Sequence, residues 1–338
     1  MFVNKIKAGE SGILTYGITP PKSGTSPERT AEIAKRIIDR VHPLNVDALI
    51  VYDVQDESAR TSTERPFPFL QAQDPFGFAS THLRELNIPK IIYRPAGKFT
   101  QPELRQWLDD LSQHNFHPVF VGLPAPDYPV KTSLSEAYAL WRHYEATSVI
   151  GAVTIPERHE MLKDEDKRIL DKVSCGVSYF ISQCVFNLSY AKTVIADLER
   201  TCNQTGVRYP TLVFTLSVCG SEKTLDFMEW LGIHIPDSLK TDFRKAENML
   251  EHSVNVCLQI ADELAAYCAS RSLPFGFNIE SVATKADEIE ASIHLVKEAQ
   301  KILNRHGLRS SSDTLLTYDS KSVIGSIDIP ASGITRNG

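Results

Sequence analysis

Short apolar, β-branched runs alternate with helical periodicity along most of this 338-residue chain. The apolar runs predict eight strands, at 12–18, 47–52, 90–93, 117–121, 148–155, 177–182, 210–216 and 274–279. Amphipathic segments separate them, and pairs such as Ser26-Pro27 and Gln101-Pro102 mark helix starts. Because each strand is followed by a helix and the composition shows no break, the pattern favours an α/β chain folded as a (β/α)8 TIM barrel over a doubly wound sheet.

Two segments depart from a minimal barrel. The connection 217–273 between the seventh and eighth strands is long enough for extra helices, and it predicts two, the second an amphipathic helix over 241–270. After Leu308 the composition becomes rich in Ser, Thr, Asp and Gly. We therefore expect one barrel domain at 1–308 and a polar, poorly packed tail at 309–338.

Composition narrows the functional classes. A net charge of -6 gives no electrostatic case for nucleic acid, and no apolar run is long enough for a membrane span. The six cysteines lack CxxC spacing and no signal peptide is apparent, which together indicate reduced thiols, no zinc site and a cytoplasmic protein. No glycine-rich dinucleotide motif follows the first strand and no P-loop motif occurs.

Ionisable side chains gather where predicted strands end, which is the end that carries the chemistry of a β/α barrel. Glu157-Arg158-His159 follows the fifth strand, with Lys172 near the end of the next helix and Gln183 after the sixth strand. Tyr52 and the polar loop 53–60 follow the second strand. Each group alone is also consistent with a solvated loop or a helix-end cation. Their shared position at strand ends favours a ligand site.

In this order and spacing the residues resemble the methylenetetrahydrofolate reductase family of flavin-dependent barrels. The resemblance covers about 12–302 and rests on Pro20-Pro21, Pro156-Glu157-x-His159, Lys172…Gly176…Gln183 and the segment 232–236. It implies an FAD-dependent oxidoreductase of one-carbon metabolism. Such an enzyme interconverts 5,10-methylenetetrahydrofolate and 5-methyltetrahydrofolate by hydride transfer through flavin N5, and the oxidative direction is included. The implied partners are a folate substrate and NAD(P)H, and a homo-oligomer is left open.

The resemblance also implies roles for individual residues. Its FAD-binding positions correspond to Tyr52, Ile155, His159, Glu165 and Lys172, of which His159 and Lys172 fall near the ribityl-phosphate region. Gln183 matches a glutamine that contacts the pterin and the nicotinamide. Tyr16 lies in the strand-end segment that forms a wall of the substrate pocket.

Three functional positions of the family are absent. Gly17 stands where the general acid glutamate belongs, 120–125 replaces an Arg-Gly-Asp segment, and Ser221 replaces the phenylalanine that stacks on nicotinamide. Since a general acid typically contributes about 10²–10⁴-fold in rate, another acid would have to serve. The candidates are Asp53, Asp56, Glu57, Asp127 and Glu157.

Two other classes of protein therefore stay open, because a fold does not fix a function. One is a non-catalytic, folate-binding or regulatory barrel that no longer needs the acid. The other is a barrel lyase or transferase that has lost the flavin. Retention of His159, Lys172 and Gln183 together favours the oxidoreductase.

Overall fold

The strands form one closed parallel barrel in chain order, with β8 returning to β1. The computed structural model describes residues 2–57, 62–123, 128–144 and 148–309. Its strands are β1 (Ile13–Ile18), β2 (Ala48–Val51), β3 (Lys90–Pro95), β4 (Phe116–Val121), β5 (Ile150–Thr154), β6 (Val177–Cys184), β7 (Thr211–Ser217) and β8 (Phe275–Glu280). All eight predicted strands are present, and the predicted (β/α)8 barrel is confirmed.

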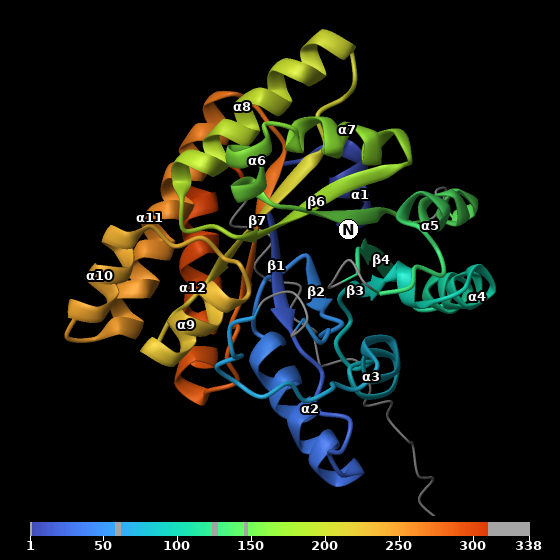
Figure 1. Cartoon of the computed structure of the whole chain (residues 1–338), viewed down its shortest axis with the longest axis horizontal. Coiled ribbons are helices and arrows are strands. Elements are labelled where there is room, and N and C mark those ends of the chain that lie inside the picture. The colour runs from blue at the N-terminus through green and yellow to red at the C-terminus, as the bar shows by residue number, and fades with distance from the viewer. Residues whose placement is uncertain (1, 58–61, 124–127, 145–147, 310–338) are drawn as a thin grey trace, which may run out of the picture.

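Helices surround this barrel, with α2 on the opposite side from α8 (Figure 1). Their bounds are α1 (Phe2–Ala8), α2 (Pro27–Val41), α3 (Pro75–His82), α4 (Gln101–Ser112), α5 (Leu134–Trp141), α6 (Pro156–Leu162), α7 (Glu165–Ser174), α8 (Leu188–Thr205), α9 (Glu222–Trp230), α10 (Asp237–Lys245), α11 (Met249–Ser270) and α12 (Ala286–Arg305). No helix of these described segments is long and apolar enough to cross a membrane.

The connection between β7 and β8 holds three helices, so the prediction of two was wrong. The expected helix over 241–270 is divided into α10 and α11 by an extended residue, Ala246. Asn248 then begins α11, because its side chain accepts a hydrogen bond from the backbone nitrogen of Glu251 at 3.2 Å. Asn is a favoured residue at the start of a helix, so Asn248 could have indicated a new helix. The apolar periodicity that runs through the whole segment suggested a single helix instead.

Alternation along the strands divides the core into two layers. Leu14, Leu49 and Phe277 belong to the layer between the strands and the helices, whereas Ile13 and Ile50 belong to the layer inside the barrel. The unpredicted helix α1 adds its Phe2 and Ile6 to that inner layer. Phe2 is 0% exposed and its ring lies 5.5 Å from that of Tyr179. The barrel is therefore filled at its N-terminal end, and its C-terminal end is left for ligands.

The chain returns to the N-terminal end of the barrel at Arg309. This side chain is buried and donates to Asp47 Oδ2 at 2.5 Å and to the carbonyl of Gly12 at 2.9 Å. Lys5 of α1 forms an ion pair with the other oxygen of Asp47 at 2.9 Å. The predicted tail was to begin at Arg309, yet this first residue is packed; the rest of that segment, 310–338, lies outside the described residues.

Candidate functional site

Inward-facing polar side chains form a hydrogen-bonded network at the C-terminal mouth of the barrel. Its centre is Asn278 of β8, which is 0% exposed. Asn278 Oδ1 accepts from Thr15 Oγ1 at 3.1 Å, and Nδ2 donates to Tyr52 Oη at 2.9 Å, to Thr215 Oγ1 at 3.3 Å and to Glu280 Oε2 at 3.3 Å. Because a buried amide is costly without such partners, the network fixes the groups that it joins.

Glu280 and Tyr52 are the partly exposed members of this network, whereas Asn278 and Cys184 are buried. The Cys184 thiol donates to Glu280 Oε1 at 3.4 Å, and Asn278 donates to its Oε2. Burial raises the pKa of Glu280 above its ordinary value, although these donors oppose the shift. Glu280 was not among the predicted residues, because its only signal in the sequence is a carboxyl residue at the end of the eighth strand.

Gly17 is the position at which the resemblance places the general acid. It lies on β1, next to Glu280 of β8. A Cβ atom on Gly17 would come within 2.7 Å of a ring carbon of Tyr52. The glycine therefore makes room for the tyrosine ring, which packs edge-on against Tyr93 with ring centroids 4.8 Å apart. Tyr52, predicted to contact a ligand, is thus placed at the mouth.

Two further carboxyl groups lie near the ends of β2 and β5. Asp53 accepts a hydrogen bond from Gln55 Nε2 at 2.5 Å, and burial raises its pKa to about 6. Glu157 is 8% exposed, burial raises its pKa to about 7, and its Oε2 has no hydrogen-bond partner within the described part of the chain. Burial raises the pKa of the Cys184 thiol, and the charges of Glu280 and Glu157 add to that effect. Burial disfavours the charged form of the Asp53 and Glu157 carboxyl groups, and hydrogen bonds from N–H donors of a ligand would stabilise that form.

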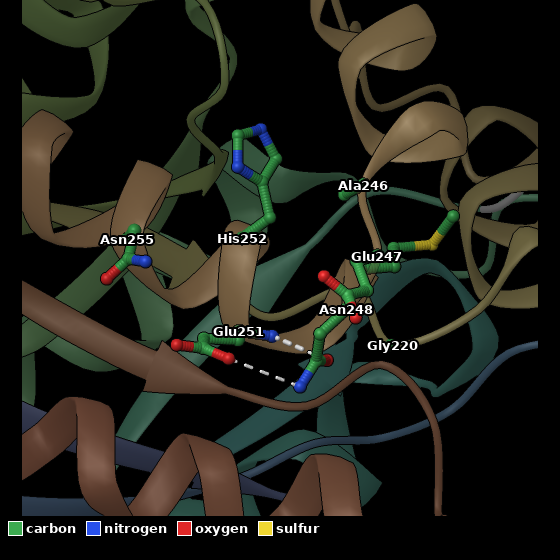
Figure 2. Close-up of a pocket in the computed structure, with 8 residues that line it drawn as sticks. Gly220, Ala246, Glu247, Asn248, Glu251, His252 and Asn255 are labelled. Atoms are coloured by element: carbon green, nitrogen blue, oxygen red, sulfur yellow. Dashed lines mark hydrogen bonds between the residues drawn. The ribbon is translucent and has the colours of Figure 1, made fainter.

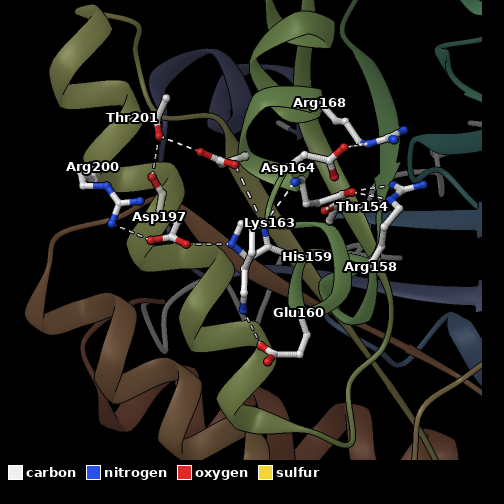
Figure 3. Close-up of polar contacts among 12 residues, drawn as sticks. Thr154, Arg158, His159, Glu160, Lys163, Asp164, Arg168, Asp197, Arg200 and Thr201 are labelled. Carbon is white, nitrogen blue, oxygen red and sulfur yellow. Dashed lines mark hydrogen bonds and ion pairs between the residues drawn. The ribbon is translucent and has the colours of Figure 1, made fainter.

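His159, by contrast, joins three helices (Figure 3). The side chain is 1% exposed, and its Nε2 lies 2.8 Å from Asp197 Oδ2 on α8. Its Nδ1 accepts a hydrogen bond from the backbone nitrogen of Glu165 at the start of α7, at 3.2 Å. Both ring nitrogens of this predicted phosphate ligand therefore have protein partners.

Glu165 and Lys172 are also held by protein groups. Glu165 is 0% exposed and accepts from Thr154 Oγ1 and from the Ile155 backbone nitrogen, both at 3.0 Å. Arg158 donates to both of its oxygens, at 2.6 and 2.8 Å. Lys172 Nζ donates to the Val153 carbonyl at 2.9 Å, and burial lowers the pKa of this amine. These contacts fit a structural role at the end of β5 better than contact with the pyrophosphate of FAD.

The remaining predicted residues divide between the mouth and the outer layer. Tyr16 is 4% exposed and its hydroxyl lies 2.9 Å from Ser292 Oγ on α12, so the side chain points away from the mouth, which does not favour the predicted substrate contact. Gln183 is partly exposed in β6, and its Nε2 donates to the carbonyl of Leu231 at 3.2 Å. Glu57 is partly exposed beyond β2, whereas Asp127 lies outside the described residues.

Ser221, which replaces the nicotinamide-stacking phenylalanine, begins α9. Its hydroxyl accepts from the backbone nitrogen of Thr224 at 3.2 Å and from Lys285 Nζ at 2.7 Å. Thr224 in turn donates to the buried Glu288 on α12 at 2.8 Å. The side chain of Ser221 thus ties the loop after β7 to α12, and its small polar group offers no aromatic face to a nicotinamide.

A separate depression lies where the α10–α11 connection meets the loop after β7 (Figure 2). It is lined by Gly220, by 246–249 and by Glu251, His252 and Asn255 of α11. Asn248 and Glu251 are bonded to one another through the helix cap, at 3.2 and 3.3 Å. Half of these residues are exposed and none is buried, so the mouth, with its buried polar network, is the stronger candidate site.

Comparisons with known proteins bear on the ligand. No family model and no curated protein matches the chain. A solved structure of an uncharacterized protein from Clostridium thermocellum, which binds two copies of 5-methyl-5,6,7,8-tetrahydrofolic acid, is 39% identical with a TM-score of 0.79, over 89% of this chain and 100% of that chain.

Two other solved structures share much less with this chain. A 2,3-dimethylmalate lyase of the PEP mutase/isocitrate lyase superfamily is 11% identical with a TM-score of 0.43, over 95% of this chain and 90% of that chain. An oxaloacetate acetylhydrolase in complex with oxalate is 11% identical with a TM-score of 0.45, over 93% and 91%. At this sequence identity and TM-score, neither structure says anything about the function of this chain. The chain belongs to the family of the Clostridium thermocellum protein.

Proposed function

We propose that this protein binds a reduced folate of the 5-methyltetrahydrofolate class at the C-terminal mouth of its barrel. The observation that carries the proposal is the 39% identity, over the whole length of that chain, with a protein that binds 5-methyltetrahydrofolic acid. The location follows from the fold, because ligands of β/α barrels bind where the strands end in loops.

The chemistry of the mouth supports this ligand. A pterin ring has apolar faces and an edge of N–H donors, and it carries no negative charge. The mouth offers the ring of Tyr52, the amide of Gln183 and the carboxyl group of Glu280. A few fixed polar groups in a largely apolar setting are typical of small-molecule sites.

The test is calorimetric titration of the full chain with 5-methyltetrahydrofolate under anaerobic, reducing conditions. We expect saturable binding in the micromolar range, about -8 kcal/mol. p-Aminobenzoylglutamate, which lacks the pterin, serves as the control ligand and should bind much more weakly. Absence of saturable binding by a folded protein would overturn the proposal.

The second candidate is the FAD-dependent oxidoreductase implied by the resemblance. What favours it is that Tyr52 and Gln183, two of its predicted ligand contacts, are both partly exposed at strand ends of the mouth. When bound, the flavin would supply hydride transfer, and Tyr52 would be the residue that contacts it. The engaged nitrogens of His159 and Lys172 weigh against a phosphate site there. NAD(P)H as donor, a homo-oligomer and a cytoplasmic location stay predictions.

Anaerobic reconstitution with FAD separates the two candidates. Retained flavin absorbance that is bleached by 5-methyltetrahydrofolate would establish the oxidoreductase. Folate binding by protein that retains no flavin would favour the folate-binding barrel.

A further inference from the structure

We propose that Glu280 recognises the aminopyrimidine edge of the pterin, accepting hydrogen bonds from its 2-amino group and its N3–H. This inference rests on the proposed function and assigns the group that reads the ligand. It concerns a residue outside every motif that the resemblance supplied. The carboxyl group that contacts the ligand would thereby come from β8, whereas the family resemblance expects such groups on the first and fourth strands.

The first support is the fixed orientation of the Glu280 side chain. Asn278 and Cys184 donate to its two oxygens, one each. These partners come from two strands, β8 and β6, and both are almost fully buried. A receptor group held in place before binding loses little conformational entropy when the ligand arrives.

The second support is the neutral character of these partners. Across the described residues, no lysine or arginine forms an ion pair with Glu280, and no cation contributes to its pKa. A carboxylate has about four acceptor positions, of which Asn278 and Cys184 use two. The thiol of Cys184, at 3.4 Å, is the weaker of these two donors and can give way to a stronger one. A pair of adjacent N–H groups would then complete the coordination of both oxygens.

The other mouth carboxyl groups are less suited to this task. Asp53 already accepts a hydrogen bond of 2.5 Å from Gln55, and the charges of Arg94 and Lys98 act on it. Glu157 has a free oxygen, but its Oε2 is buried and the residue is only 8% exposed. Glu157 is therefore the main competitor that an experiment must exclude.

The experiment compares two ligands on four proteins by calorimetric titration. The ligands are 5-methyltetrahydrofolate and its 2-desamino-2-methyl analogue, and the proteins are the wild type, Glu280→Gln, Glu157→Gln and Glu298→Gln. Glu298 pairs with Lys301 on the outer helix α12, so it is the matched surface control. We expect Glu280→Gln to weaken binding of 5-methyltetrahydrofolate by about 10- to 100-fold, the range for hydrogen bonds to a charged group.

The analogue makes the assignment specific. The wild type should bind the analogue less tightly by a similar factor, whereas Glu280→Gln should bind both ligands almost equally, because the two changes remove the same contact. Equal affinity of the wild type for both ligands would overturn the role of Glu280 without any variant, so the test survives a variant that does not fold. Loss of discrimination in Glu157→Gln instead would move the role to Glu157 and overturn the assignment. Failure of the wild type to bind either ligand would overturn the proposed function itself.

Discussion

A Cβ atom on Gly17 would lie 3.2 Å from the Cβ of Glu280, closer than two such carbons pack without displacing one another. A side chain at position 17 would therefore compete for space with Glu280 and with the ring of Tyr52. In this chain the glycine leaves that space to these two residues.

Substitution Gly17→Ala should weaken folate binding by about tenfold or more, because the new methyl group displaces Tyr52 and Glu280 by overpacking worth about 1–3 kcal/mol. Calorimetric titration with 5-methyltetrahydrofolate measures the effect. Gly24→Ala is the matched control, since a Cβ there meets no atom within 4 Å. Unchanged affinity in Gly17→Ala would show that the position of Glu280 is not critical.

Substitution Glu157→Gln should stabilise the protein at pH 8 relative to the wild type and have little effect at pH 5. Burial raises the pKa of Glu157 from 4.5 to about 7. The protonated form therefore stabilises the native state fully below the unfolded value, and this contribution is lost as the pH rises through about 7. The difference reaches about 3 kcal/mol at most. Urea unfolding of both proteins at the two pH values measures it, and an equal difference at both would contradict the assignment.

Substitution Asp197→Asn should destabilise the fold by about 1–3 kcal/mol, because it weakens a hydrogen bond to the buried His159. The affinity for 5-methyltetrahydrofolate should stay within twofold of the wild type. Arg200→Ala removes the exposed partner of Asp197 and should cost less than about 1 kcal/mol. If Asp197→Asn lost ligand affinity while its stability was unchanged, His159 would be assigned a ligand-binding role.

Binding of 5-methyltetrahydrofolate should release protons, increasingly so as the pH falls toward the raised pKa of Glu280. Burial favours the protonated acid in the free protein, whereas two N–H donors favour the carboxylate. The affinity should therefore decrease at acidic pH. Titrations in buffers of different ionisation enthalpy measure the number of protons released. The same number in Glu280→Gln would assign the release to another group.

Continuous apolar runs were enough to predict the eight strands, because every strand of a filled barrel is buried on both sides. Hydrophobic patterning was not enough for α1, since seven residues with two lysines carry little periodicity. The alternation of side chains along a strand also predicts which face of the barrel each residue occupies, and the predicted role of Tyr16 did not take this into account. Tyr16 shares its parity with the outward-facing Leu14, whereas Thr15 faces inward toward Asn278.

The site was less predictable, because its parts come together only through closure of the barrel. Asn278 and Tyr52 are more than two hundred positions apart in the chain and are bonded at 2.9 Å. The cluster Glu157-Arg158-His159 was visible as a motif, yet the short helix α6 turns His159 toward α8 and leaves Glu157 near Cys184. Sequence order identifies the strand end that carries a residue, and the rotation of the helix decides which way its side chain faces.

Helix α1 closes the end of the barrel at which the strands begin, because its Phe2 and Ile6 fill that end. A ligand bound at the network around Asn278 would therefore enter and leave past the loops that follow the strands. The rate at which it escapes would then depend on those loops, and substitutions in α1 that keep its packing would leave that rate unchanged.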